Sequence, residues 1–209
     1  MNSLDILLNK AILQSMQNAI DKEKFRRIEL QLHEHGFEIS EMLNKFGQLR
    51  SKLFEFEQDF KKIEDIILRD FFTTEEHSSE TWLVINNKVL TELILKTFAD
   101  EDKKLILDFT RNSSETIPRI LSLCNLPNTS GYRKVKQLID DGFVIPTGMS
   151  ETFEGRRALL YRSMIQKVQV YINKNDVIAK ILVPKEILNS SLIVKTISDI
   201  NERRGIVAN

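Results

Sequence analysis

The chain has 209 residues, 42% of them hydrophobic and 29% charged, which is enough for one ordinary domain plus a smaller partner or for two small domains. Its 30 Lys and Arg side chains balance its 30 Asp and Glu side chains, and a net charge of zero excludes a strong nonspecific nucleic-acid binder. The longest apolar runs are too short for a membrane span and the single Cys124 excludes an internal disulfide, so we expect a cytoplasmic protein without membrane contact.

Two amphipathic helices are predicted before Gly36. The first has Ser3 as its N-cap and apolar residues at three- and four-residue spacings, namely Leu4, Leu8, Ile12, Met16 and Ala19. The second is capped by Asp21 and has Phe25, Ile28 and Leu32 on one face. We expect Gly36 to end this second helix.

A longer helix is predicted to begin at Ser40. Its apolar residues alternate at spacings of four and three, namely Met42, Phe46, Leu49, Leu53, Phe56, Phe60, Ile63 and Ile67. Leu43, Phe54 and Ile66 widen this stripe, which is typical of a helical bundle. The stripe fits a core within one chain and a homodimer interface about equally well. We assign residues 1–75 to an N-terminal helical region and expect a homodimer held chiefly by helices outside residues 82–165.

The next segment changes from polar to apolar. Residues 73–80, TTEEHSSE, predict a linker because they are almost entirely polar. Trp82–Ile85 predicts a short strand. Residues 87–98 predict a helix with apolar side chains at Val89, Leu90, Leu93, Ile94 and Phe98.

Three further helices are predicted in close succession. Asp100 can cap the first, and Thr116 followed by Ile117-Pro118 starts a short second one. Asn125-Leu126-Pro127 breaks the second helix, and the third covers about residues 129–141 and ends at Gly142. Gly131 would let the third helix approach the second closely. With a strand at 143–145 and a hairpin after it, this order predicts a winged helix-turn-helix within residues 82–165.

The third of these helices has the side chains that DNA reading requires. Its exposed side is expected to hold Thr129, Ser130, Tyr132, Arg133, Lys134, Lys136 and Gln137. Arg can pair with guanine and Gln with adenine, while Ser, Thr and Lys can hold phosphates. Residues 129–167 carry 7 basic and 4 acidic side chains, whereas residues 1–80 carry 11 basic and 16 acidic ones. The sequence therefore predicts double-stranded DNA as the partner of this helix.

A basic glycine turn follows in the predicted wing, at about residues 147–158. Arg156 and Arg157 come directly after Gly155, between two apolar segments that read as strands. We expect both arginines to contact the phosphate backbone or the minor groove.

The stretch TIPRILSLCNLPNTSGYRKVKQLIDDGFV, followed by FEGRRALLYRS, resembles the ArsR-like winged-helix regulators, especially archaeal ones. TSGYRK at the start of the third helix and LIDDG at its end carry the resemblance, which covers residues 82–183 and extends only weakly to the N-terminal helices. It implies a dimeric transcriptional regulator. The chain lacks the paired cysteines of the metal sensors in that family and has no clustered histidines, so metal sensing is not implied.

Residues 166–209 predict a β-hairpin and a C-terminal helix. Val168, Val170 and Ile172 alternate with polar residues, 173–176 reads as a turn, and 177–183 reads as the return strand. Pro184 would start a single final helix, with 201–209 as a frayed tail. The predicted fold class is mainly α with a small antiparallel β component, comprising a winged helix-turn-helix and an N-terminal helical region.

No catalytic, cofactor or metal site is predicted. The chain has no Gly-rich phosphate loop, HExxH or GxSxG motif, and its three histidines have no metal-ligand spacing with Cys124. Asp140 and Asp141 are adjacent on a helix, so their side chains point about 100° apart. The competing interpretation is a winged-helix module that binds another protein and not DNA. A basic recognition face favours DNA.

Overall fold

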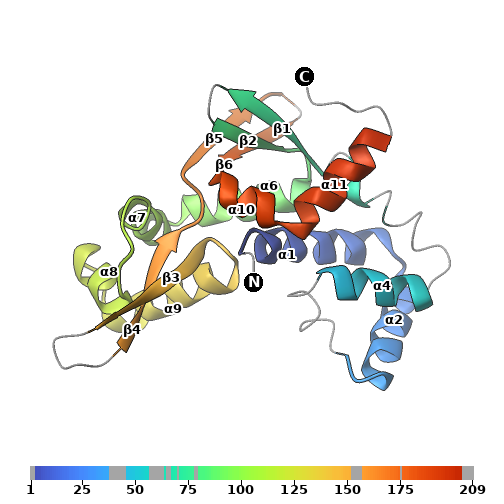
Figure 1. Cartoon of the computed structure of the whole chain (residues 1–209), viewed down its shortest axis with the longest axis horizontal. Helices are drawn as coiled ribbons and strands as arrows, with labels where there is room; N and C mark the ends of the chain where they lie inside the picture. Colours follow the sequence, from blue (N-terminus) through green and yellow to red (C-terminus); the bar gives the residue numbers. More distant parts are fainter. Residues whose placement is uncertain are drawn as a thin grey trace.

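A computed structural model describes residues 3–37, 46–56, 64, 67–69, 71–77, 80–151, 157–174 and 176–203. It is mainly helical with a small antiparallel β component, as the sequence predicted (Figure 1). The described strands form a four-stranded sheet and a two-stranded sheet, both antiparallel. The helices are α1 (Ser3–Ala19), α2 (Lys22–Glu34), α4 (Phe46–Phe56), α6 (Lys88–Ala99), α7 (Glu101–Phe109), α8 (Ile117–Leu123), α9 (Asn128–Asp140), α10 (Lys185–Ser190) and α11 (Leu192–Arg203). The strands are β1 (Phe72–His77), β2 (Glu80–Ile85), β3 (Val144–Glu151), β4 (Arg157–Ser163), β5 (Lys167–Ile172) and β6 (Val177–Leu182).

The first two helices follow the predicted pattern. The side chain of Asp21 accepts hydrogen bonds from the backbone N–H groups of Glu23 and Lys24 at 2.9 and 3.3 Å and so caps α2. Gly36 has a φ of +77°, the left-handed conformation expected after a helix end. In α1 the predicted apolar residues are buried except Ala19, which is exposed.

The predicted long helix falls largely outside the described residues. Its described parts are α4, which packs on α2 and α11, and residues 64 and 67–69. Three residues of the widened apolar stripe are described with their side chains. Leu53 is 1% exposed and Ile67 is 7% exposed, and Phe54 is partly buried against the same core. At these positions the stripe contributes to the core within one chain. The side chains of Met42, Phe46, Leu49, Phe56, Phe60 and Ile63 lie outside the described residues.

The linker predicted at 73–80 is wrong. Residues 72–77 form β1, which pairs with β2 in an antiparallel register that joins Phe72 to Ile85 and His77 to Glu80. β1 is an edge strand, and edge strands commonly carry charged side chains because one of their sides faces water. Residues 73–77 are therefore polar because β1 lies at the edge of the sheet, and not because they form a linker.

The four-stranded sheet joins segments from both halves of the chain, in the order β1-β2-β6-β5. The hairpin β5–β6 is confirmed, with Lys167 opposite Leu182 and Ile172 opposite Val177. The single helix predicted after Pro184 is instead two helices, α10 and α11, separated at Ser191. The predicted frayed tail begins too early, because Asn201 belongs to α11, is 7% exposed, and donates a hydrogen bond to the carbonyl oxygen of Phe72.

Asp5 explains why α11 starts anew after Ser191. Its carboxylate accepts hydrogen bonds from the hydroxyl of Ser191 and from the backbone N–H groups of Leu192 and Ile193. The Ser191 hydroxyl also accepts a hydrogen bond from the N–H of Val194 at 3.0 Å, which is a local helix cap. A carboxylate of the first helix, α1, thus accepts hydrogen bonds from the free N–H groups at the start of the last helix, α11.

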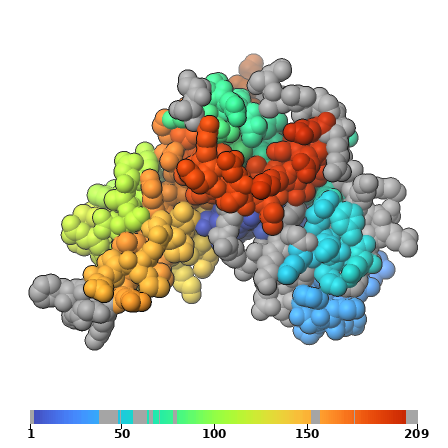
Figure 2. All heavy atoms as spheres, in the orientation of Figure 1, coloured from blue at the N-terminus to red at the C-terminus, as the bar shows by residue number. Residues whose placement is uncertain are grey.

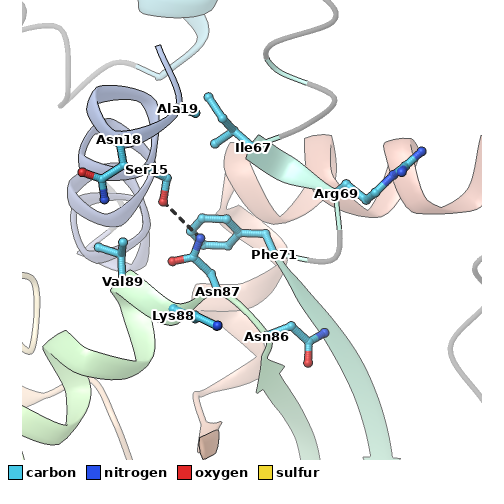
Figure 3. Close-up of a pocket in the computed structure, with 10 residues that line it drawn as sticks. All are labelled: Ser15, Asn18, Ala19, Ile67, Arg69, Phe71, Asn86, Asn87, Lys88 and Val89. Carbon is cyan, nitrogen blue, oxygen red and sulfur yellow. Dashed lines mark hydrogen bonds between the residues drawn. The ribbon is translucent and has the colours of Figure 1, made fainter. Parts of the chain in front are cut away.

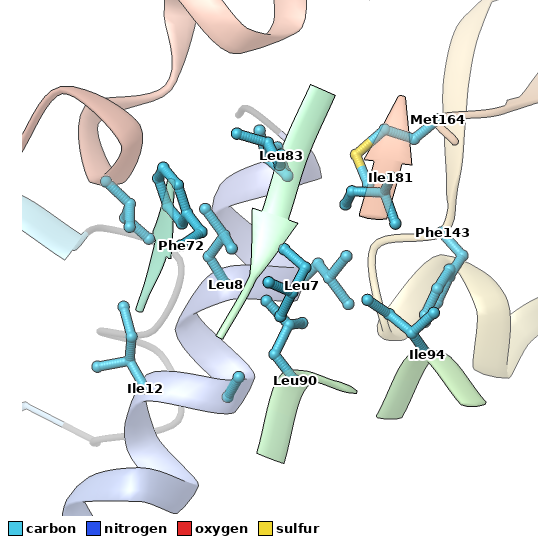
Figure 4. Packing of buried hydrophobic residues seen from close by; sticks show 14 of the residues in the cluster. Leu7, Leu8, Ile12, Phe72, Leu83, Leu90, Ile94, Phe143, Met164 and Ile181 are labelled. Atoms are coloured by element: carbon cyan, nitrogen blue, oxygen red, sulfur yellow. The ribbon is translucent and has the colours of Figure 1, made fainter. Parts of the chain in front are cut away.

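One buried cluster runs through the chain from α1 to α11 (Figure 4). Leu7 and Leu8 of α1 lie beside Leu83 of β2, Leu90 of α6 and Phe72 of β1. Figure 2 shows α8, α9 and the β3–β4 hairpin at one side of the molecule, with α2 and α4 at the other. Within the described part of the chain, no helix is long and apolar enough to cross a membrane.

Replacing Asp5 by Ala should lower the free energy of unfolding by about 1–2 kcal/mol, because the first N–H groups of α11 lose their carboxylate partner. Urea unfolding followed by circular dichroism measures this. Asp199→Ala, at an exposed position of α11, is the matched control and should change the free energy of unfolding by less than about 0.5 kcal/mol. Equal losses in the two variants would contradict the capping role of Asp5.

Candidate functional site

Helix α9 has one buried and one exposed face. Gly131, Val135 and Leu138 are buried, and they recur at the spacing of one helical face. The opposite face holds five of the predicted DNA-reading residues, all exposed, namely Thr129, Tyr132, Arg133, Lys136 and Gln137. Ser130 lies at the border of the two faces and is half-buried. The five exposed side chains form one continuous surface because they are spaced at three, four, seven and eight residues.

The position of α9 is fixed by close packing on α8. A Cβ atom added to Gly131 would lie 2.5 Å from Cδ2 of Leu121, so the two helices approach closely and a larger residue would force the Leu121 side chain to shift. The turn between them passes through Asn125, which has a φ of +50°. Asn tolerates this left-handed conformation better than most residues do. The predicted helix break and the predicted close approach at Gly131 are both confirmed.

Lys134 differs from the prediction of an exposed side chain. Its ammonium group lies 2.7 Å from a carboxylate oxygen of Asp100 and 2.8 Å from one of Asp102, at the start of α7, and its side chain is only 17% exposed. Sequence spacing could not show this pairing, because the two acids precede Lys134 by more than 30 residues. Lys134 therefore links α9 to α7, and its charge is balanced within the protein.

The pKa values of this cluster reflect the pairing. Hydrogen bonds to Asp100 and then to Asp102 raise the pKa of Lys134 above its ordinary value. Burial tends to raise the pKa of Asp100, but hydrogen bonds from Lys134 and from the backbone N–H of Lys103 outweigh it and lower that pKa. Both groups are thus held in their charged forms at neutral pH.

Arg133 and Lys136 contrast with Lys134. Among the described residues, neither makes an ion pair with an acidic side chain, and both are exposed. Their charges are therefore available to a partner. Arg119, on the exposed side of the neighbouring helix α8, is a further basic residue that the sequence analysis did not single out.

The segment before α8 and the β3–β4 hairpin form one unit. Glu115 pairs with Tyr161 of β4 through two backbone hydrogen bonds of 2.8 and 3.0 Å, and the N–H of Ser163 donates to the carbonyl oxygen of Thr110 at 2.9 Å. The hairpin register runs from Val144 opposite Ser163 to Glu151 opposite Arg157. These bonds hold the base of the hairpin against the end of α7 and the start of α8.

The hairpin carries both predicted and unpredicted exposed residues. Arg157 is exposed and lies opposite Glu151, whereas Arg156 lies outside the described residues. Met149 and Leu159 are cross-strand partners that are 65% and 43% exposed. Sequence analysis missed this apolar pair because it assigned only residues 143–145 to the first strand, which in fact extends to Glu151.

Helix α1 holds the far end of α9. Gly142, with a φ of +80°, ends α9, and a Cβ atom there would lie 2.6 Å from the carbonyl oxygen of Ser3 and 2.9 Å from the nitrogen of Leu7. Lys10 forms an ion pair with Asp141, so Asp141 is a contact between helices and not a freely solvated end. Asp140, beside it, is exposed.

A hollow of about 440 Å³ lies at the other end of α1, between α1 and the start of α6 (Figure 3). Its lining includes Ser15, which accepts a hydrogen bond of 3.1 Å from the side chain of Asn87, the N-cap of α6. Phe71 and Ile67 contribute apolar surface, and Arg69 points away from Ser15 and Asn87. The lining is mostly neutral. The hollow lies at the C-terminal end of α1, whereas Gly142 and the end of α9 contact its N-terminal end, so the hollow is separate from the exposed face of α9.

Neither a reactive thiol nor a metal-binding cluster is found among the described residues. Cys124 is buried, and burial, with a smaller contribution from the charge of Asp102, raises the pKa of its thiol to about 11. The thiol is therefore protonated at neutral pH and behaves as a small core residue. Within the described ranges, no group of three or more His, Cys, Asp or Glu side chains is placed to hold a metal ion.

Comparisons of the chain with protein-family models, with curated proteins and with solved structures found no match. The functional argument therefore depends on the residues and their geometry.

Replacing Lys134 by Met should lower the free energy of unfolding at pH 7 by at most about 1 kcal/mol, since Asp100 and Asp102 stay partly exposed to water. The loss should be constant near neutral pH. It should shrink as the pH falls below 3.8, because the lowered pKa of Asp100 means that its contribution is present above 3.8 and disappears as it is protonated. It should also shrink above pH 10.5, where Lys134, whose pKa is raised, loses its proton.

Urea unfolding over a series of pH values tests this expectation. Lys136→Met is the matched control, since Lys136 is exposed on the opposite face of the same helix. A loss for Lys136→Met that equals the loss for Lys134→Met would refute the structural role of Lys134.

Proposed function

We propose that the chain is a sequence-specific DNA-binding transcriptional regulator of the winged helix-turn-helix type. The observation that carries the proposal is the exposed face of α9, where Arg133, Lys136 and Gln137 lie together and the two cations have no acidic partner among the described residues. In this proposal α9 enters the major groove, and the β3–β4 hairpin is the wing that lies against the DNA backbone.

The order and bonding of the elements support this proposal. Helices α7, α8 and α9 are followed by the β3–β4 hairpin, and the segment before α8 pairs with the outer side of β4 at Glu115 and Tyr161. In a winged helix-turn-helix the recognition helix is the last of three helices before such a hairpin. The motif resemblance to ArsR-like regulators favours the same assignment for residues 82–183.

Each exposed side chain of α9 has a chemical role in the proposal. Arg133 can donate two hydrogen bonds to the O6 and N7 atoms of guanine, and Gln137 can pair with adenine. Lys136 and Thr129 suit phosphate oxygens, as does the half-buried Ser130 at the start of the helix. Tyr132 is 44% exposed and offers both an apolar ring and a hydroxyl group. Lys134 is assigned to the α7 contact and not to DNA.

A net charge of zero is consistent with a protein that binds specific DNA sequences. Affinity for any duplex grows with the number of phosphates neutralised, and few unpaired cations lie near α9. Arg133, Lys136, Arg119 and Arg157 are the exposed basic residues on α8, α9 and the hairpin in the described part of the chain. We therefore expect weak nonspecific binding and a larger gain from base contacts.

A second candidate function is supported by the exposed apolar pair on the hairpin. Met149 and Leu159 lie on the same face of the hairpin and would suit a protein partner, since exposed apolar groups commonly mark such contacts. Winged helices also serve as protein-binding scaffolds. The two functions differ in salt dependence, because only phosphate contacts release counterions from DNA.

Arg133→Ala should weaken binding to the preferred duplex by roughly 5- to 150-fold, which corresponds to about 1–3 kcal/mol, and should relax specificity at one base position. The preferred duplex is first selected from a random pool with the wild-type protein, and affinities are then measured by fluorescence anisotropy at fixed salt. Arg26→Ala, on the exposed side of α2, is the control and should bind like the wild type. If Arg133→Ala binds selected and random duplexes as the wild type does, the proposed role of α9 fails.

Neutralising the wing arginines should have a different signature. Arg156→Ala with Arg157→Ala should weaken selected and random duplexes by similar factors and reduce the slope of log affinity against log salt by at most about two units. Met149→Ala with Leu159→Ala is the comparison, since these residues share the hairpin face of Arg157 but have no charge. An unchanged salt slope in the arginine variant would exclude the wing as a phosphate contact. An absence of DNA binding by the wild type would favour the protein-binding alternative.

A further inference from the structure

The two edges of the four-stranded sheet differ in chemistry. β1 forms one edge and ends in Glu75, Glu76 and His77, so charge protects it from pairing with another strand. β5 forms the other edge, and its residues 168–172 (VQVYI) contain neither a charged residue nor a proline. Long uncharged edges are the ones that pair with further strands.

The β5 edge also exposes an unusual amount of apolar surface. Val170 is 40% exposed, Tyr171 47% and Ile172 77%, and Val177, opposite Ile172 in β6, is 40% exposed. This strip borders a groove of about 450 Å³ between α6 and the start of β6, to which Leu95 and Val177 contribute. Val170, Ile172 and Val177 share one face of the sheet and Tyr171 lies on the other, because successive side chains of a strand alternate. The groove lining also contains the charged residues Lys88, Glu92 and Asp176, so the apolar surface is the strand edge itself.

The backbone of β5 has unused hydrogen-bonding capacity on the same side. Among the described strands β5 pairs only with β6, and the N–H of Asn173 donates to the carbonyl oxygen of Asp176 at 2.9 Å. Along an antiparallel strand, the backbone N–H and C=O groups of successive residues point alternately to the two sides of the strand. Because Asn173 bonds toward β6, the backbone groups of the odd-numbered residues bond to β6 and those of the even-numbered residues point to the open side. The N–H and C=O groups of Val168, Val170 and Ile172 are therefore available at the open edge.

The occupant that fits this edge is a second β5 strand. If two copies pair antiparallel about Val170, Val168 of one copy lies opposite Ile172 of the other, and Gln169 lies opposite Tyr171. No like charges meet, because Lys167 comes opposite Asn173. All three outward-facing residues of each copy would then form hydrogen-bonded pairs, and the two sheets would become continuous.

We propose that the protein forms a homodimer by antiparallel pairing of two β5 strands centred on Val170. This interface uses a surface different from the 42–67 stripe, in which Leu53 and Ile67 are already buried within the chain. It does not depend on DNA binding.

The solution mass of the full chain gives the first test. Sedimentation at micromolar concentration should give twice the 24.3 kDa of one chain. Val170→Pro should shift the protein to the monomer, weakening association at least tenfold, because it removes the donor at the centre of the interface. Its fold should be retained, since the N–H of Val170 does not bond to β6; circular dichroism checks this. Ile172→Lys should dissociate the dimer as well, and it keeps the test valid if the proline variant does not fold.

Leu192→Lys is the matched control, because Leu192 is 57% exposed on α11, and it should remain dimeric. The register is tested by disulfide formation in the full chain. Val170→Cys should cross-link to itself under mild oxidation, since the two copies of residue 170 face each other at about 5.5 Å between Cα atoms. Ile172→Cys should not cross-link, and the native Cys124 is buried.

A monomeric wild type at micromolar concentration would overturn the proposal. So would full dimerisation of folded Val170→Pro and Ile172→Lys, or cross-linking of Ile172→Cys in preference to Val170→Cys. Dissociation by Leu192→Lys as strong as that by Ile172→Lys would also overturn it, because the loss would then not be specific to β5.

Discussion

Helix α1 is the first helix of the chain, yet its residues Leu4, Leu7 and Leu8 are completely buried in the core of the protein. It packs on α6, α10 and α11, which come from distant parts of the sequence (Figure 1). Its polar residues bond to the same surroundings, as Asp5 caps α11 and Ser15 contacts the N-cap of α6. Because apolar burial and these hydrogen bonds act together, the sheet and its helices assemble around α1.

The burial of α1 also positions the candidate functional site. Ser3 and Leu7 press against Gly142 at the end of α9, and Lys10 pairs with Asp141 beside it. Asp100 and Asp102 hold α9 through Lys134 from the side of α7, and Leu121 fills the space above Gly131. Helix α9 is thus restrained from several sides while one face stays exposed. A recognition element gains precision when its supporting contacts come from rigid helices, so this arrangement suits a helix that reads base edges.

The distribution of charge divides the basic residues into two groups. Some hold the fold together, as Lys134 does with Asp100 and as Lys180 does with Glu75 on the sheet. Others, including Arg133 and Lys136, remain exposed on α9. A count of basic residues along the sequence cannot separate these groups, because the acidic partners are far away in the chain. In the proposed function, only the second group contributes to DNA affinity and to its salt dependence.

The local sequence determined the starts and ends of most helices, because capping and helix termination depend on a few neighbouring residues. Asp21, Asp100 and Gly142 each act where the sequence predicted. The order of α7, α8, α9 and the hairpin was likewise predictable from helix breaks and alternating apolar residues.

Only the tertiary structure decided which distant residues come into contact. The strand β1 was mistaken for a linker because its polar residues do not show that it pairs with β2, which is itself held in the sheet by the distant strand β6. The break at Ser191 depends on Asp5, and the pairing of Lys134 depends on two acids of another helix. Periodicity and capping act over a few residues, whereas strand pairing, distant caps and ion pairs depend on how the whole chain folds.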